Sequence, residues 1–245
     1  MLSLSTQKAT LIVNVRNSSD LVDLSPLKNH GKPLRSLKKE RIEARRPVSR
    51  AENKLAGAAR AFSYDFRHKI VLDIGSSTGG FTEFALLSGV QKVIAVEKGT
   101  NQMKAPLRFD PRVDLREKTD IFTVERQSLS PQGVEIDTVL ADVSFVSLKP
   151  ILNYIKAHLA SPDTEYLVML KPQFEAQSYQ LKRGVIKNEK IRREIIKDFE
   201  SWLKNHGFLI INKRDNLLTG KNGNLERFYF LKNAKTLKKH STPKA

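Results

Sequence analysis

The chain of 245 residues contains no cysteine, which excludes a disulfide framework and a cysteine-based metal centre. Its five histidines are scattered and form no H-E-x-x-H pattern, so we predict no metal site. No apolar run approaches the ~18 residues that a membrane span requires. The first residues lack the charged and apolar regions of a secretory signal, and we therefore expect a cytoplasmic protein.

Acidic residues are scarce relative to basic ones. The sequence holds 43 Lys and Arg against 26 Asp and Glu, a formal net charge of +17. Such an excess favours a polyanionic partner, with nucleic acid the first candidate and an acidic membrane surface the second. Hydrophobic residues make up 40% of the chain, which is enough for a sizeable core. We therefore expect a folded protein with nucleic acid as the first candidate partner.

Composition divides the chain into a basic N-terminal extension (1–46), a main domain (47–232) and a basic tail (233–245) that we expect to be disordered. Between Lys28 and Lys54, ten Lys or Arg stand against three Glu. Such a run is either a solvated, disordered segment or a surface that contacts RNA. In the second interpretation, the RNA-binding residues are Lys38, Lys39, Arg41, Arg45, Arg46 and Arg50.

A glycine-rich turn follows the apolar run Ile70 to Ile74, which predicts a buried parallel strand. Backbone without Cβ atoms lets a ligand approach the free N–H groups of the helix that comes next. Asp73 in this strand, and Glu97 at the end of a second apolar run, are carboxylates suited to a nucleoside ligand. The alternative is a tight turn without a ligand. The residues of the turn are Gly75, Ser76, Ser77, Thr78, Gly79, Gly80 and Phe81.

The spacing of this turn distinguishes two cofactor classes. It reads G-S-S-T-G-G, which differs from the G-x-G-x-x-G pattern typical of dinucleotide-binding proteins. It resembles motif I of the S-adenosylmethionine-dependent methyltransferases. An NAD-dependent enzyme is therefore the less favoured hypothesis.

Strand and helix patterns alternate along the main domain, which predicts an α/β fold. The last two strands are joined by a short turn that contains glycine, as in an antiparallel hairpin. We predict a mostly parallel seven-stranded sheet with helices on both faces and an antiparallel edge hairpin. We also predict a short helix over Asn101–Leu107 and a polar loop over Gln173–Lys187.

Four charged residues stand out by their positions. Lys54 lies on the leading helix, Asp142 and Lys171 end adjacent buried strands, and Glu226 lies on the last strand. By itself, Lys54 is more typical of a surface residue. A ribose 2′-hydroxyl is a poor nucleophile, and a lysine whose pKa is lowered by burial and a second ammonium can take its proton. Two lysines held by two carboxylates therefore suit proton transfer beside a methyl donor.

Five sequence blocks occur in order along the chain. They are Ser49-Arg50-Ala51-x-x-Lys54-Leu55, Leu72-Asp73-Ile74-Gly75-x-Ser77-Thr78-Gly79-Gly80-Phe81-Thr82, Asp142-Val143-Ser144-Phe145, Leu170-Lys171-Pro172-Gln173-Phe174-Glu175 and Thr219-Gly220-x-x-Gly223-Asn224-x-Glu226. Together they resemble the TlyA family, which belongs to the FtsJ-like 2′-O-ribose methyltransferases of ribosomal RNA. The resemblance covers roughly Val48 to Leu231.

The resemblance implies a Rossmann-like methyltransferase fold, S-adenosyl-L-methionine as cofactor, and ribosomal RNA or ribosomal subunits as partner. It implies a catalytic tetrad with Lys171 as the base and Asp142 beside the donor. It implies that Asp73, the glycine turn and Glu97 hold the cofactor, with Asp120 and Ile121 near the adenine. The tetrad consists of Lys54, Asp142, Lys171 and Glu226.

The chain also departs from the family pattern. TlyA proteins usually begin with an S4 RNA-binding domain, and residues 1–46 show no S4 pattern. The family usually has Gly-Gly at Ala51-Glu52, Asp at Glu97 and a small residue at Lys98. We expect an S-adenosylmethionine-dependent RNA 2′-O-methyltransferase; the alternative is a non-catalytic RNA-binding protein that retains the fold.

Overall fold

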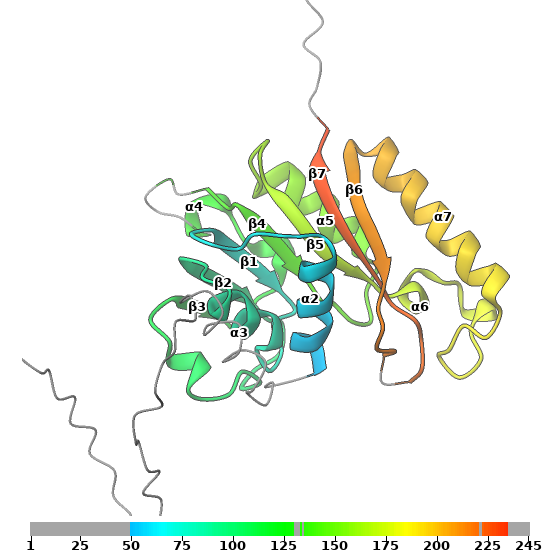
Figure 1. Ribbon diagram of the computed structural model, residues 1–245, viewed down its shortest axis with the longest axis horizontal. Helices are drawn as coiled ribbons and strands as arrows, with labels where there is room; N and C mark the ends of the chain where they lie inside the picture. Colours follow the sequence, from blue (N-terminus) through cyan, green and yellow to red (C-terminus); the bar gives the residue numbers. More distant parts are fainter. Residues whose placement is uncertain (1–49, 130–132, 134, 221, 235–245) are drawn as a thin grey trace, which may run out of the picture. The chain divides into compact units, whose positions relative to one another are not determined.

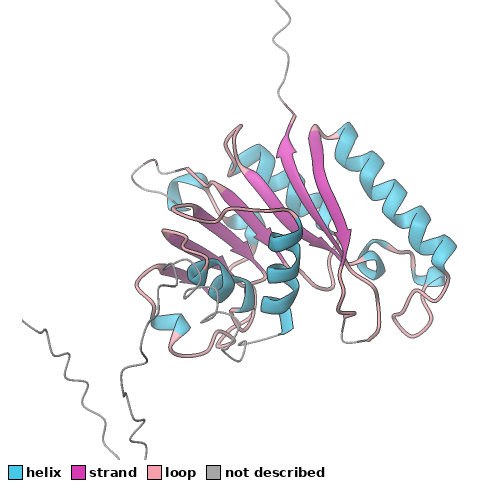
Figure 2. Cartoon of the chain, viewed as in Figure 1, coloured by secondary structure: helices cyan, strands magenta, loops and turns pink. Residues whose placement is uncertain are grey.

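A computed structural model describes residues 50–129, 133, 135–220 and 222–234 (Figure 1). Its centre is a seven-stranded sheet of order β3-β2-β1-β4-β5-β7-β6 (Figure 2). β1 pairs with β2 and β4 in parallel, β2 with β3, and β4 with β5; β7 is antiparallel to both β5 and β6. The strands are β1 (Ile70–Ile74), β2 (Lys92–Val96), β3 (Val113–Arg116), β4 (Thr138–Ala141), β5 (Glu165–Leu170), β6 (Phe208–Asp215) and β7 (Arg227–Asn233).

Helices cover both faces of the sheet (Figure 1). One face packs against α2 and α3, whose Leu55 and Phe84 lie in one apolar cluster. The other packs against α5 and α7, whose Ile155 and Phe199 lie in a second cluster. The helices are α2 (Arg50–Ala61), α3 (Gly80–Leu87), α4 (Arg126–Leu129), α5 (Leu148–His158), α6 (Pro172–Glu175) and α7 (Glu189–Asn205), with short 3₁₀ turns η1 (Leu107–Phe109), η2 (Ile121–Thr123) and η3 (Ser178–Gln180).

The predicted sheet is confirmed, including the antiparallel edge pair β6–β7 and the helices on both faces. The central strands are mostly apolar because both of their faces are covered: β1 and β4 are buried at every position. β6 lies at the edge and is mostly exposed beyond Phe208. β7 extends through Asn233, which pairs with Phe208, one residue beyond the boundary expected from composition.

The helix predicted over Asn101–Leu107 is wrong. Asn101 has φ +55°, a left-handed conformation that an α-helix cannot contain. The N–H of Gln102 donates to the Glu117 carboxylate (3.0 Å), and only the short turn η1 begins at Leu107. The predicted loop over 173–187 contains two short elements, α6 and η3.

The sheet brings chemically active residues to one of its edges. Parallel strands place their carboxyl ends at the same edge, so the residues after β2, β4 and β5 lie there together. β7 runs the other way, and Leu170 pairs with Arg227, so the start of β7 meets the end of β5. Glu226 precedes β7 by one residue, whereas the sequence pattern had predicted it on the strand itself.

Candidate active site

Two lysine–carboxylate pairs lie at this edge. Lys171, directly after β5, places its Nζ 2.7 Å from Oδ1 of Asp142, directly after β4. Lys54, on α2, forms an ion pair with Oε2 of Glu226. The structure therefore brings together all four residues of the predicted tetrad, from four separate elements.

The four side chains are largely withdrawn from solvent. The exposed fractions are 4% for Glu226, 10% for Lys54, 11% for Lys171 and 18% for Asp142. Burial raises the pKa of Asp142, and the neighbouring Lys171 ammonium opposes that rise. The Lys171 ammonium also donates a hydrogen bond to Ser144 Oγ (2.6 Å), which fixes the position of its Nζ.

The glycine turn packs tightly against the residues after β4. Gly75 has φ +73°, and a Cβ there would lie 3.1 Å from the carbonyl oxygen of Asp142. Gly79 has φ +95°, and a Cβ there would lie 2.3 Å from a methyl group of Leu107. Only glycine tolerates both the backbone conformation and the lack of space.

Asp73 is fully buried behind this turn. Its Oδ2 accepts a hydrogen bond from the Thr82 hydroxyl (2.6 Å). Burial raises the pKa of Asp73 to about 7. Among the described residues, no hydrogen-bond partner reaches the other oxygen, Asp73 Oδ1, or the buried Ser76 hydroxyl. Buried polar atoms are almost always paired, so these two suit a ligand or an ordered water.

A cavity of about 580 Å³ opens beside the turn, and we name it the Glu97 cavity. It extends from Glu97 to Asp142 and is a suitable size for a nucleoside-sized ligand. Gly75, Ser77, Asp120 and Ile121 also line it. The other predicted cofactor-binding residues do not line it: Asp73, Ser76, Thr78, Gly79, Gly80 and Phe81.

Glu97 ties two backbone segments together. Its Oε2 accepts from the N–H of Ser77 (2.9 Å), and its Oε1 accepts from the N–H of Gly99 (2.7 Å). In the same cavity lining, Lys98 donates to Oδ2 of Asp120 (2.9 Å) and holds the pKa of Asp120 below its usual value. The unusual Lys98 thus has a partner, which the sequence did not reveal.

Comparisons with known proteins identify the family. The model of the FtsJ-like methyltransferase family matches residues 47–233. The chain belongs to this family. The 23S rRNA (cytidine-2'-O)-methyltransferase TlyA of Campylobacter jejuni is 36% identical over 185 residues, which are 75% of this chain and 70% of that protein. The 16S/23S rRNA (cytidine-2'-O)-methyltransferase TlyA of Mycobacterium tuberculosis is 34% identical over 188 residues, 76% and 68% of the two chains.

A solved structure has the same fold. A candidate hemolysin from Lactococcus lactis matches with a TM-score of 0.72 and 32% identity over 76% of this chain and 88% of that one. The predicted resemblance to the TlyA proteins and the methyltransferase fold are therefore confirmed.

Two residues of this FtsJ-like site were not selected from the sequence. Ser144 contacts the Lys171 amine, as described above. Phe145 is 91% exposed, has φ +65° and lies with its ring centroid 5.2 Å from that of Phe174. Both belong to the Asp142–Phe145 block; an aromatic residue three positions after a strand-end carboxylate was the available signal.

The predicted RNA-binding residues lie outside the described residues, apart from Arg50. Arg50 is exposed at the start of α2 and donates to the carbonyl oxygen of Thr219 (2.9 Å), which links α2 to the turn before Glu226. Within residues 50–129, 133, 135–220 and 222–234, no cluster of three metal-ligating side chains is found. No helix in the same residues is long and apolar enough to cross a membrane.

Proposed function

We propose that this FtsJ-like methyltransferase transfers a methyl group from S-adenosylmethionine to a ribose 2′-hydroxyl of ribosomal RNA. The observation that carries the proposal is the paired arrangement of Lys54–Glu226 and Lys171–Asp142 beside the Glu97 cavity. The TlyA relatives from C. jejuni and M. tuberculosis, named for methylation of cytidine 2′-oxygens in rRNA, support the same substrate class.

The residues around the Glu97 cavity fit S-adenosylmethionine. Glu97 and Asp120 offer carboxylates at one end for ribose and base, and Ile121 and Phe122 offer an apolar surface. Asp142 at the other end favours a positive charge. Behind the turn, Asp73 Oδ1 and the Ser76 hydroxyl have no hydrogen-bond partner among the described residues. They can therefore form hydrogen bonds with the amino-acid end of the cofactor or with a bridging water.

Lys171 accepts the proton in the proposed reaction. When bound, S-adenosylmethionine supplies an electrophilic methyl carbon, which the 2′-oxygen attacks while the bonding pair of the broken C–S bond stays on sulfur. The amine of Lys171 takes the hydroxyl proton on its Nζ. Asp142 and Ser144 hold that Nζ in place before and after the transfer.

Lys54 and Glu226 position the second half of the site. Their ion pair fixes α2 against the turn that precedes β7, so one side of the ribose site is held in a fixed position. Phe145 offers an exposed aromatic face close to Asp142, on which the base of the reactive nucleotide can stack. Most of the rate enhancement then comes from alignment of the hydroxyl with the methyl group.

The test is tritiated-methyl transfer from S-adenosylmethionine to ribosomal subunits that lack the modification, followed by mapping of the labelled nucleotide. We expect label that survives alkaline hydrolysis as a 2′-O-methylated dinucleotide. Cofactor binding without any transfer to RNA would instead favour a non-catalytic RNA-binding protein. Binding of NAD in preference to S-adenosylmethionine would refute the assignment of the cavity.

A further inference from the structure

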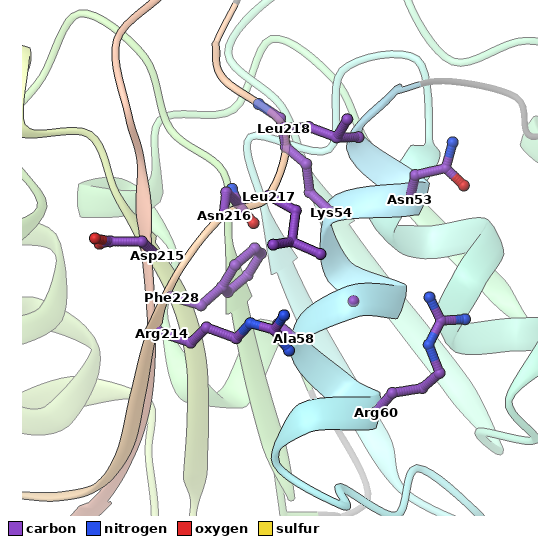
Figure 3. Close-up of a pocket in the computed structure, with 11 residues that line it drawn as sticks. Asn53, Lys54, Ala58, Arg60, Arg214, Asp215, Asn216, Leu217, Leu218 and Phe228 are labelled. Atoms are coloured by element: carbon purple, nitrogen blue, oxygen red, sulfur yellow. The ribbon is translucent and has the colours of Figure 1, made fainter.

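A second cavity lies between α2 and the strands β6 and β7, and we name it the Arg214 groove (Figure 3). We propose that it binds the phosphodiester backbone of single-stranded RNA on one side of the reactive ribose. This inference rests on the proposed function. The groove is lined by Asn53, Lys54, Gly57, Ala58, Arg60, Arg214, Asp215, Asn216, Leu217, Leu218 and Phe228.

The groove adjoins the catalytic tetrad. Lys54 lines it and forms the ion pair with Glu226. Asn216, on the groove wall, lies with Nδ2 3.4 Å from Oε2 of Glu226. The Glu97 cavity reaches the other pair of the tetrad through Asp142. A ribose at the tetrad therefore has the methyl donor on one side and the groove on the other.

Two arginines of the groove have no ion-pair partner in the part of the chain that the structure describes. Among the described residues, no carboxylate lies within ion-pair distance of Arg60 or Arg214, although Arg67, Arg112 and Arg116 all have such partners. Of the described residues that line the groove, only Asp215 is acidic. It pairs with Arg192 (2.7 Å) and Arg227 (2.6 Å) and points away from α2 in Figure 3. Two unpaired guanidinium groups beside a cavity favour an anion, and guanidinium forks match phosphate geometry.

The floor between these charges is apolar. Ala58, Leu217 and Phe228 line the groove together with Arg60 and Arg214, and Leu217 is 82% exposed although it is a large apolar side chain. A free inorganic anion gains nothing from such a floor, whereas the sugar and base edges of a nucleotide can pack on it. The volume is about 270 Å³, less than half that of the Glu97 cavity, which suits a single strand rather than a duplex.

The main test neutralises both arginines in the full chain as Arg60→Gln/Arg214→Gln. The matched control is Lys197→Gln/Lys204→Gln, two exposed lysines on α7 across the sheet from α2. We expect the KM for RNA to rise about tenfold or more with the arginine variant, in line with loss of a charged hydrogen bond. The salt dependence of RNA binding should flatten by ~0.7 for each phosphate that the variant no longer binds. Affinity for S-adenosylmethionine should not change.

A steric variant separates the groove from general charge effects. Gly57 lines the groove, and a Cβ there would meet no atom within 4 Å, so Gly57→Leu adds apolar bulk at the groove. It keeps every charge and replaces a helix-interior glycine, so it should fold at least as well as the wild type. We expect weaker RNA binding from Gly57→Leu and an unchanged thermal midpoint or a higher one.

The outcomes separate the two proposals. If the wild type binds RNA but transfers no methyl group, the proposed function is refuted, and the binding titrations still decide the role of the groove. If the wild type is active and the arginine and Gly57 variants match the lysine control in KM and salt slope, the groove proposal is wrong.

Discussion

Removal of the proposed proton acceptor is the most direct perturbation of this site. Lys171→Met keeps the apolar stem of the side chain and removes its amine. A positioned general base is typically worth ~10²–10⁴-fold in rate, which corresponds to ~3–5 kcal/mol of activation free energy. We expect a loss in this range in kcat for methyl transfer. S-Adenosylmethionine should still bind, because Lys171 does not line the Glu97 cavity.

The same substitution also has a stability cost. Lys171 is the ion-pair partner of Asp142, whose side chain is only 18% exposed. Without the ammonium, that carboxylate is left partly buried, and Asp142, whose pKa burial already raises, takes up a proton more readily. We expect a loss of ~1–3 kcal/mol in the free energy of unfolding, the usual cost of an unpaired buried polar group. Lys171→Arg should recover much of this stability but little activity, because arginine does not accept a proton at neutral pH.

The control breaks a comparable ion pair at the opposite edge of the sheet. Lys69 precedes β1 and pairs with Glu165 at the start of β5, with 24% and 17% of their side chains exposed. Lys69→Met should lose stability and keep activity. Urea unfolding and single-turnover methyl transfer measure the two quantities on all variants. If Lys171→Met retains activity within fivefold of Lys69→Met, Lys171 is not the proton acceptor.

Three further predictions concern the cofactor side and the RNA side. Burial raises the pKa of Asp73 from 3.8 to about 7, so the folded state holds a proton that the unfolded state releases between these values, and stability falls as pH rises through that window. The Asp73→Asn side chain does not titrate. As pH rises from 4 to 7, the free energy of unfolding of Asp73→Asn should therefore increase relative to that of the wild type by up to ~4 kcal/mol; parallel stability curves for the two proteins would contradict this prediction. Glu97→Ala should weaken S-adenosylmethionine binding by ~1–3 kcal/mol, because it unpairs cofactor and backbone donors, and unchanged affinity in calorimetry would mean that Glu97 only braces the turn. Replacement of four basic residues of the N-terminal extension by glutamine should reduce the slope of log RNA affinity against log salt concentration by about three, while cofactor binding stays intact. Equal slopes for wild type and variant in RNA titrations would mean that another part of the chain binds the RNA. These four residues are Lys38, Lys39, Arg45 and Arg46.

Much of this site could be predicted from local sequence patterns. Apolar runs of strand length predict strands, and a polar residue directly after such a run must lie at the end of that strand. This reasoning predicts Glu97, Asp142 and Lys171 at strand ends. The glycine turn was equally local, since positive φ at Gly75 and Gly79 depends on the absence of a side chain. The mostly parallel sheet followed from the alternation of strands with helices, and the edge hairpin followed from the connection containing glycine between the last two strands.

Other features depend on contacts between distant segments. The pairing of Lys54 with Glu226 joins residues 172 positions apart, and it arises because antiparallel β7 begins where β5 ends. No pattern in the sequence indicated that Lys98 would reach Asp120. The predicted helix over Asn101–Leu107 failed for a similar reason: Glu117, which lies 15 positions further along the chain, accepts the N–H of Gln102 in place of a helical carbonyl.

The Arg214 groove could not be predicted from the sequence and is visible only in the tertiary structure. Arg60 and Arg214 do not stand out in the sequence, where basic residues are abundant. They line one cavity because α2 packs across the sheet near β7. No carboxylate of the described residues pairs with them, since the adjacent Asp215 is already held by two other arginines. Sequence determined which residues could end strands and which turns could admit a ligand, since these are properties of neighbouring residues. Only the packed sheet decided which charges were paired and which were left to face a cavity, because that depends on the distance between segments far apart in the chain.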